Sequence, residues 1–264
     1  MFDWYERLIP IQPSQHRQLG WLPARSLAMV SHRQWLPACL GDLSQAAAHV
    51  PTAVLEREGQ LSPVVLMSLL PHQNHYLTEQ GQAREDYVPL VLRPYPFARA
   101  TITERQSPTL CIEASHLVEL DTPGAEPLFE NGQLAPPVQK IMQMLDAIAR
   151  DHEVGRAACQ LLQQKGLLED WPLNVRYGNE VTRIEGLRKA DLDALNGLSR
   201  EDFADLQKHY AAALAYTQNV STHQLGRLKQ WAAQQRPAAG AGGIPESLDS
   251  FFGKEDDDLT FDFD

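Results

Sequence analysis

The sequence predicts an α+β fold. Short β-type runs, punctuated by Pro and Gly, fill much of the first half, and a long amphipathic segment opens at Pro136. Helix signals then dominate the chain after residue 189. We therefore expect a Pro-rich N-terminal β-sheet region, a long central helix, a small hairpin, a C-terminal helical set and a disordered acidic tail.

The predicted strands of the first half share β-branched and aliphatic residues and belong to one sheet. They cover residues 52–57, 64–70, 98–103 and 109–113. Glu58-Gly59-Gln60 lies between the first two and suits a hairpin turn, because glycine tolerates positive φ. The Ala-rich residues 42–49 predict a short helix that ends before Pro51.

The central helix is predicted from the spacing of its apolar residues. These recur at steps of three and four at Val138, Ile141, Met142, Leu145, Ile148 and Ala149. Residues 157–162 keep the same spacing until Gly166, a suitable C-cap, so the whole segment is expected to form one bent helix.

After the central helix, residues 173–177 and 181–184 predict a hairpin with its turn at Gly178-Asn179. Three helices follow. The first covers residues 189–196, the second starts at Arg200 after the cap Ser199, and the third runs to about Ala233 from a cap at Ser221 or Thr222.

Charge and composition divide the chain into a body and a tail. Residues 1–235 are expected to form the globular body, and the Pro/Gly/Ala stretch 236–243 a flexible linker. Residues 244–264 hold eight acidic side chains and one lysine, which gives −7 of the net charge of −11. This tail also keeps large apolar residues, unlike a plain solvating tail. It resembles the acidic, aromatic tip of bacterial single-stranded-DNA-binding proteins, which recruits partner proteins.

The composition of the 264 residues is that of an ordinary globular protein, with 43% hydrophobic residues. Cys39, Cys111 and Cys159 are odd in number and widely spaced, so we expect a reducing, cytoplasmic location and no disulfide framework. The start of the chain lacks the pattern of a secretory signal, and the longest apolar stretch, 63–70, is too short to cross a bilayer. The acidic balance argues against nucleic-acid binding.

Motifs of the well-marked enzyme classes are absent. The chain has no GxxxxGK[ST], GxGxxG, GxSxG or HExxH sequence. His72 and His75 lie three apart, but no carboxylate or Cys completes a metal shell, and we interpret them as exposed loop histidines. No cofactor and no metal are predicted.

The segment 87–97 is the densest run of aromatic, Pro and Arg residues in the body. Two interpretations are open. It lines a groove for a ligand, because rigid aromatic and guanidinium groups bind at low entropic cost, or it forms a buried corner in which Arg93 satisfies backbone carbonyls.

Residues spread over most of the body resemble the SapC-like family of bacterial proteins, which is named after a gene of a surface-layer protein locus. They include the stretch 10–19 with His16, Val50-Pro51, Pro63-Val64-Val65-Leu66, Asn74, Tyr87-Val88-Pro89, Arg93, Tyr95-Pro96-Phe97, Leu110-Cys111-Ile112, Glu126-Pro127-Leu128-Phe129, Gly132, Gly166-Leu167-Leu168, Gly186-Leu187, Leu192, Leu195 and Tyr210. The resemblance implies an accessory role beside tryptophan-halogenase-like proteins, cupin-like oxygenases and outer-membrane receptors.

The first functional hypothesis is a non-catalytic cytoplasmic accessory protein that binds a protein or peptide partner, in a surface-layer, secretion or peptide-modification system. The alternative is a metal-dependent or other modification enzyme whose site is scattered along the chain. A third hypothesis, a nucleic-acid-associated factor, conflicts with the charge of the body. We assign partner binding in the body to His16, Tyr87, Arg93, Tyr95 and Phe97, and in the tail to Phe251, Phe252, Leu259, Phe261 and Phe263.

Overall fold

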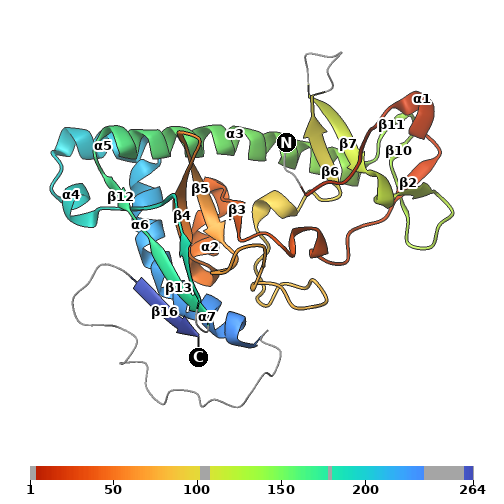
Figure 1. Cartoon of the computed structure of the whole chain (residues 1–264). Coiled ribbons are helices and arrows are strands. Elements are labelled where there is room, and N and C mark those ends of the chain that lie inside the picture. The colour runs from red at the N-terminus through yellow and green to blue at the C-terminus, as the bar shows by residue number, and fades with distance from the viewer. Residues whose placement is uncertain (1–3, 102–107, 178–179, 235–258, 264) are drawn as a thin grey trace.

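The computed structural model describes residues 4–101, 108–177, 180–234 and 259–263. The fold is α+β, as the sequence predicts. One long helix, α3 (Pro136–Gln164), crosses the molecule, and small sheets lie along it (Figure 1). Among the described residues, no helix is both long and apolar enough to cross a membrane.

The largest sheet of the described residues has five strands in the order β12-β15-β4-β5-β3. Their bounds are β3 Trp35–Pro37, β4 Thr52–Arg57, β5 Gln60–Leu66, β12 Leu168–Asp170 and β15 Leu187–Ala190. The predicted hairpin of β4 and β5 turns at Glu58 and Gly59, with φ of 54° and 75°. Both residues thus adopt the left-handed conformation that such turns need.

The strand predicted over residues 64–70 is shifted in the structure, because β5 begins at Gln60 and ends at Leu66. Beyond it, the Ser68 hydroxyl accepts a hydrogen bond from the Leu70 amide and donates one to the Leu70 carbonyl, both at 2.9 Å. This local side-chain turn competes with strand pairing and ends the strand.

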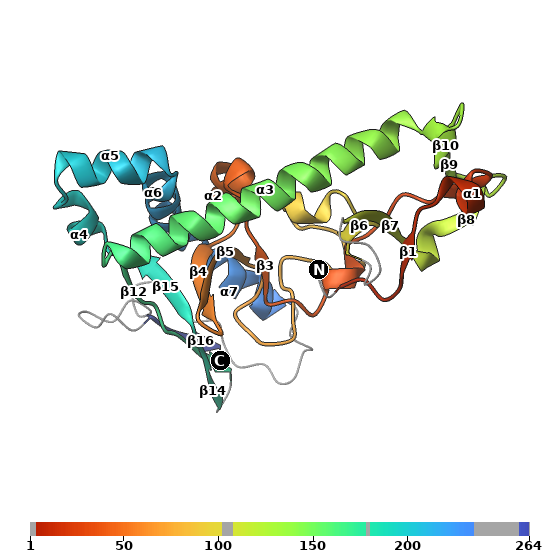
Figure 2. The ribbon, with the colours of Figure 1, turned by 90° about the horizontal axis from the view of Figure 1, so that it is seen from above.

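Three smaller sheets lie beside the first half of α3 (Figure 2). One has the order β1-β7-β6, with β1 Leu8–Pro10, β6 Phe97–Ala100 and β7 Thr109–Glu113. The second has the order β8-β2-β9, with β2 Leu19–Trp21, β8 Leu117–Glu119 and β9 Glu126–Pro127. The third pairs β10 (Phe129–Glu130) with β11 (Gln133–Leu134), and helix α1 (Pro13–His16) precedes β2. The predicted strand 98–103 corresponds to β6, and residues 102–107 lie outside the described residues. The prediction that the four strands of the first half share one sheet is wrong, because β4 and β5 lie in the five-stranded sheet whereas β6 and β7 pair with β1.

Helix α3 connects the two apolar cores. Val138, near its start, packs in a cluster with Trp21, Phe97 and Leu128. Its later residues, such as Leu162, belong to the larger cluster beneath the five-stranded sheet. The helix is continuous over the whole predicted range, and Gly166 follows it with a φ of 68°.

One glycine of α3 is needed for close packing. A Cβ at Gly155 would lie 3.0 Å from Cγ of Pro63 in β5, so the missing side chain lets the helix approach the sheet.

The second half of the chain forms the predicted hairpin and a helical set. The hairpin consists of β13 (Leu173–Tyr177) and β14 (Glu180–Ile184). The helices are α4 Leu192–Asn196, α5 Arg200–Lys208, α6 Ala211–Ser221 and α7 Leu225–Gln234, and α2 (Leu43–His49) from the first half packs against α6. Four short 3-10 turns of the first half are η1 Ala28–Val30, η2 Leu40–Asp42, η3 Leu90–Leu92 and η4 Ala114–His116, and η5 (Thr222–Gln224) joins α6 to α7.

The C-terminal helices differ from the prediction in three ways. The helix predicted from a cap at Ser221 or Thr222 begins at Leu225, after η5, because both hydroxyls donate to carbonyls of the preceding turn instead of capping the helix. The helix predicted from Lys189 begins at Leu192, because Lys189 pairs in β15 and the Asp191 side chain accepts from the Ala194 amide as N-cap. Helix α6 is not predicted by the sequence. It is separated from α5 by Tyr210, whose φ of 61° breaks the helical path. The Ser199 cap of α5 is confirmed by the bond from the Asp202 amide.

The C-terminal strand β16 (Leu259–Phe263) pairs parallel with β13 and completes a sheet of order β14-β13-β16. Its sequence alternates apolar and polar residues, the period of a strand. The predicted linker 236–243 and residues 244–258 and 264 of the predicted tail lie outside the described residues.

Candidate functional site

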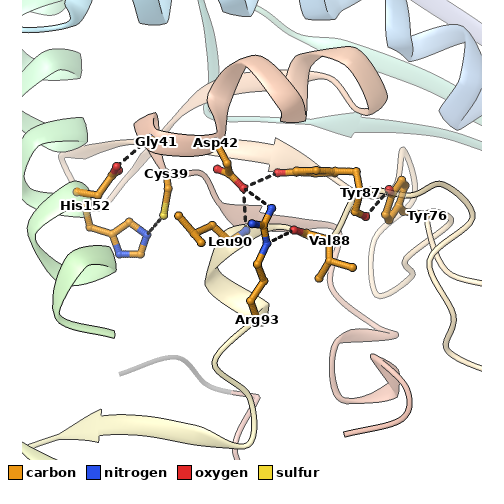
Figure 3. Close-up of polar contacts among 10 residues, drawn as sticks. Cys39, Gly41, Asp42, Tyr76, Tyr87, Val88, Leu90, Arg93 and His152 are labelled. Atoms are coloured by element: carbon orange, nitrogen blue, oxygen red, sulfur yellow. Dashed lines mark hydrogen bonds and ion pairs between the residues drawn. The ribbon is translucent and has the colours of Figure 1, made fainter. Parts of the chain in front are cut away.

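The five residues predicted for partner binding in the body do not come together in one place. Tyr87 and Arg93 lie together around a third residue, Asp42 (Figure 3). Tyr95 and Phe97 contact the aromatic residues of the neighbouring sheet region, and His16 lies in α1. The structure therefore assembles a site from two of the five residues and adds a carboxylate that carries no sequence motif.

Asp42 is the centre of this polar network. It ends η2 and precedes α2, and its side chain is only 6% exposed. Its Oδ2 accepts hydrogen bonds from the Tyr87 hydroxyl at 3.0 Å and from the Leu90 amide at 2.8 Å. Arg93 Nη2 lies 3.9 Å from the same oxygen. Burial raises the pKa of Asp42, although these bonds and the Arg93 charge act in the opposite direction.

Tyr87 ties several elements together. Its ring stacks on His49 of α2, with ring centroids 5.5 Å apart, and its carbonyl accepts from the Tyr76 hydroxyl at 2.6 Å. Burial and the nearby Asp42 charge raise the pKa of Tyr87, so the hydroxyl remains protonated and donates to the carboxylate. Tyr87 is thus a buried anchor rather than an exposed contact.

Arg93 is the charged residue of the segment 87–97 that keeps access to solvent. Its side chain is 37% exposed, and its Nε donates to the Val88 carbonyl at 2.9 Å. This bond matches one of the two interpretations of the sequence, in which Arg93 satisfies a backbone carbonyl. The backbone amide of Arg93 caps η3 by donating to the Leu90 carbonyl, and part of the side chain stays at the surface.

The other predicted residues of the body have structural partners. Tyr95 is half-buried between Tyr5 and His116, at centroid distances of 5.6 and 5.1 Å. Phe97 is fully buried and meets Trp21 edge to face at 4.8 Å. His16 is also buried, and its Nδ1 accepts from the Gln12 amide at 3.0 Å.

Three of the five predicted tail residues belong to the described part of the chain. Phe251 and Phe252 lie outside the described residues. The other three lie in β16 at positions paired with β13: Leu259 with Leu173, Phe261 with Val175 and Phe263 with Tyr177.

A second polar cluster without a sequence motif lies beside the first. Cys39 Sγ is 3.6 Å from His152 Nε2 on α3. Burial, together with the charges of Asp151 and Asp42, raises the pKa of the Cys39 thiol, and burial lowers the pKa of His152. Both shifts favour the neutral forms, whereas a nucleophilic cysteine needs the thiolate.

Asp151, the neighbour of His152, joins α3 to η2. Its carboxylate accepts from the Leu40 amide at 2.6 Å and from the Gly41 amide at 2.8 Å. Because Asp42 follows directly, this contact fixes the backbone that carries the central carboxylate of the site.

Two hollows flank these clusters. One of about 270 Å³ lies between α3 and the β4–β5 hairpin, and its lining includes Trp35, Arg57, Ser62, His152 and Arg156. The other, of about 410 Å³, is lined by Ser44, Gln45, Ala48, His49, Asp86 and Tyr87. The second hollow lies between α2 and the start of the segment 87–97.

The interpretation of His72 and His75 as two exposed loop histidines is wrong for His75. His72 is exposed, but His75 is buried and bonded to the Ser68 hydroxyl at 2.9 Å and to Gln73 Oε1 at 2.7 Å. Within the described ranges, no group of three or more His, Cys, Asp or Glu residues is placed to hold a metal ion.

Comparison with known proteins gives a family match. The family model named SapC matches residues 11–228, which is most of the chain. No curated protein and no solved structure matches it.

Proposed function

Because the chain belongs to the SapC family, we propose that it is a non-catalytic, cytoplasmic accessory protein that binds a protein or peptide partner. Recognition by the body is assigned to the surface at Arg93 and the half-exposed Tyr95, and the C-terminal segment supplies a second contact. The partner belongs to a surface-layer, secretion or peptide-modification system.

The observation that carries this proposal is the way Asp42 holds the segment 87–93. The carboxylate accepts hydrogen bonds from the Tyr87 hydroxyl and the Leu90 amide. Arg93 is also held by the hydrogen bond that its Nε donates to the Val88 carbonyl. A guanidinium held in this way loses little conformational freedom when it binds, and arginine is suited to paired contacts with carboxylates. The proposed partner therefore presents an acidic group to Arg93.

The state of the nucleophilic groups supports a binding role over a catalytic one. Burial raises the pKa of Cys39 and of Cys159, the latter to about 12, so both thiols stay protonated near neutral pH. All three cysteines are free and buried, which fits a reducing compartment.

One observation favours the alternative, a modification enzyme. His152 lines the hollow of about 270 Å³, so an imidazole, the guanidinium groups of Arg57 and Arg156 and the carboxylate of Glu58 border one concave surface. A concave surface with several convergent polar groups suits a polar small molecule. Stoichiometric iron or zinc in the purified protein would favour this enzyme over the accessory protein.

The experiment for the proposed function is affinity capture from the native lysate, with the full chain and with a chain truncated after Gln235. We expect both to recover the same partner, with less recovered by the truncated chain, because the body recognises the partner and the tail adds a contact. If only the full chain recovers the partner, the body does not recognise it, and this part of the proposal is contradicted. Recovery by neither chain would contradict the proposed function.

A further inference from the structure

We propose that the outer edge of β13 is a strand-docking site and that its resident ligand is the C-terminal strand of this same chain, residues 259–263. The inference rests on the proposed function, in which the tail is a second contact for the partner. It adds that the body of the same chain binds this tail. A strand of the same pattern, presented in trans, competes for the same edge.

The first step is the position of β13. It lies between β14 and β16, and five consecutive residues of β16 pair with it in a parallel register. Figure 1 shows β13 and β16 side by side. Leu173 and Val175 of β13 are fully buried, so the hairpin is anchored in the main core. Without β16, this anchored strand would present a row of unpaired backbone groups, which is the feature that recruits an added strand.

The second step is the match of sequence patterns along the register. Leu173, Val175 and Tyr177 alternate with Asn174 and Arg176 in β13. The apolar residues of β16 alternate with polar residues in the same way. In the register, each apolar residue of β16 is therefore paired with an apolar residue of β13, and each polar residue with a polar residue. The pairs are Leu173 with Leu259, Asn174 with Thr260, Val175 with Phe261, Arg176 with Asp262 and Tyr177 with Phe263.

The third step is charge. Arg176 and Asp262 occupy paired positions, and opposite charges at neighbouring positions of two strands stabilise the pairing. A shift of the register by one residue toward the end of β13 would pair Leu259 with Asn174 and Phe261 with Arg176, so apolar would meet polar. The edge therefore selects an extended segment that alternates large apolar residues with a polar and an acidic residue.

The fourth step is the covalent tether. Residues 235–258 connect Gln234, at the end of α7, to Leu259 at the start of β16. A strand that is covalently joined to the body meets its site without the cost of a bimolecular encounter. A weak strand interaction is therefore sufficient for docking in cis, and a trans competitor must bind more tightly or be abundant.

The test is a charge exchange in the full chain, read by hydrogen exchange of the β13 amides. In Arg176→Glu and in Asp262→Lys, the alternate β13 amides that face β16 are expected to exchange about fivefold faster. The double variant, with the charges exchanged, is expected to restore protection. The Asp262→Lys chain keeps the body intact and gives the result even where Arg176→Glu fails to fold.

The matched control is Arg183→Glu in β14, which makes the same charge change on an exposed residue whose partner in the register is Asn174 of β13. It is expected to leave the exchange of the amides facing β16 unchanged. Equal protection in wild type and both single variants, or a double variant that fails to recover, would overturn the proposal.

A second measurement tests docking in trans. A fluorescent peptide with the sequence of residues 256–264 is expected to bind the full-length Asp262→Lys chain several-fold more tightly than wild type, because the edge of β13 is then less occupied in cis. Equal affinity for both chains would contradict the competition. Neither measurement involves the partner, so failure here leaves the capture experiment of the proposed function standing, and the reverse also holds.

Discussion

Replacing Asp42 with alanine is expected to lower the free energy of unfolding by about 2–4 kcal/mol. The substitution removes the acceptor for the Tyr87 hydroxyl and the Leu90 amide. Each donor left buried without a partner costs about 1–3 kcal/mol, and the lost ion pair with the part-exposed Arg93 adds little. Urea denaturation of the full chain, followed by circular dichroism, measures the change.

The control for this prediction is Asp146→Ala. Asp146 forms an ion pair with Arg99 at 2.9 Å, but both side chains are about one-third exposed. Exposed pairs contribute about 0–1 kcal/mol, so the control is expected to stay within that range. If both variants lose the same stability, the Asp42 carboxylate does not organise the segment 87–93.

Acidification is expected to destabilise the protein through His75. Burial, helped by the Arg84 charge, lowers the pKa of His75 from 6.5 to about 4. Since the unfolded chain takes up the proton first, the stability from this group is present above pH 6.5 and is lost as the pH falls toward 4. The difference between the two pKa values corresponds to about 3 kcal/mol.

The measurement compares urea midpoints at pH 7.5 and pH 4.5 in wild type, His75→Gln and His72→Gln. His75→Gln is expected to reduce the loss of stability at low pH, because the group that titrates is gone. His72 is exposed on the same loop, so His72→Gln is expected to keep the full loss. An unchanged pH dependence in His75→Gln would show that another group causes the acid sensitivity.

Local patterns were sufficient to predict the elements that depend on neighbours in sequence. The whole of α3 follows from its apolar spacing, with Pro136 at its start and Gly166 beyond its end. The turn at Gly59 and the hairpin of β13 and β14 follow from glycine and β-type residues. Each of these signals lies within the element that it describes.

The strand order was not predictable, because the pairings join distant segments. Strand β1 pairs with β7, so Leu8 lies beside Glu113, and β2 pairs with two strands a hundred residues later. Such pairings depend on packing across the whole chain, and the short strands of two or three residues have no periodicity to detect. Helix α6 was missed because Tyr210, which separates it from α5, has no glycine signal.

The candidate site was predictable only in part for the same reason. Tyr87 and Arg93 stand out in a dense aromatic and Arg segment, but Asp42, which joins them, lies 45 positions before Tyr87. An aspartate at the start of a short helix is a common N-cap residue, so nothing in the neighbouring sequence marks Asp42 as the centre of a network. Phe97 belongs to the same segment, yet strand β6 carries it into the other core.

The central claim is that the body recognises its partner through Arg93, and the most direct measurement is the affinity of the captured partner for three chains: wild type, Arg93→Ala and Arg99→Ala. Loss of a central arginine contact is expected to weaken binding at least about tenfold in Arg93→Ala. Arg99, on β6 and paired with Asp146, is the matched control and is expected to bind like wild type. Equal affinity of all three folded chains would contradict recognition at Arg93.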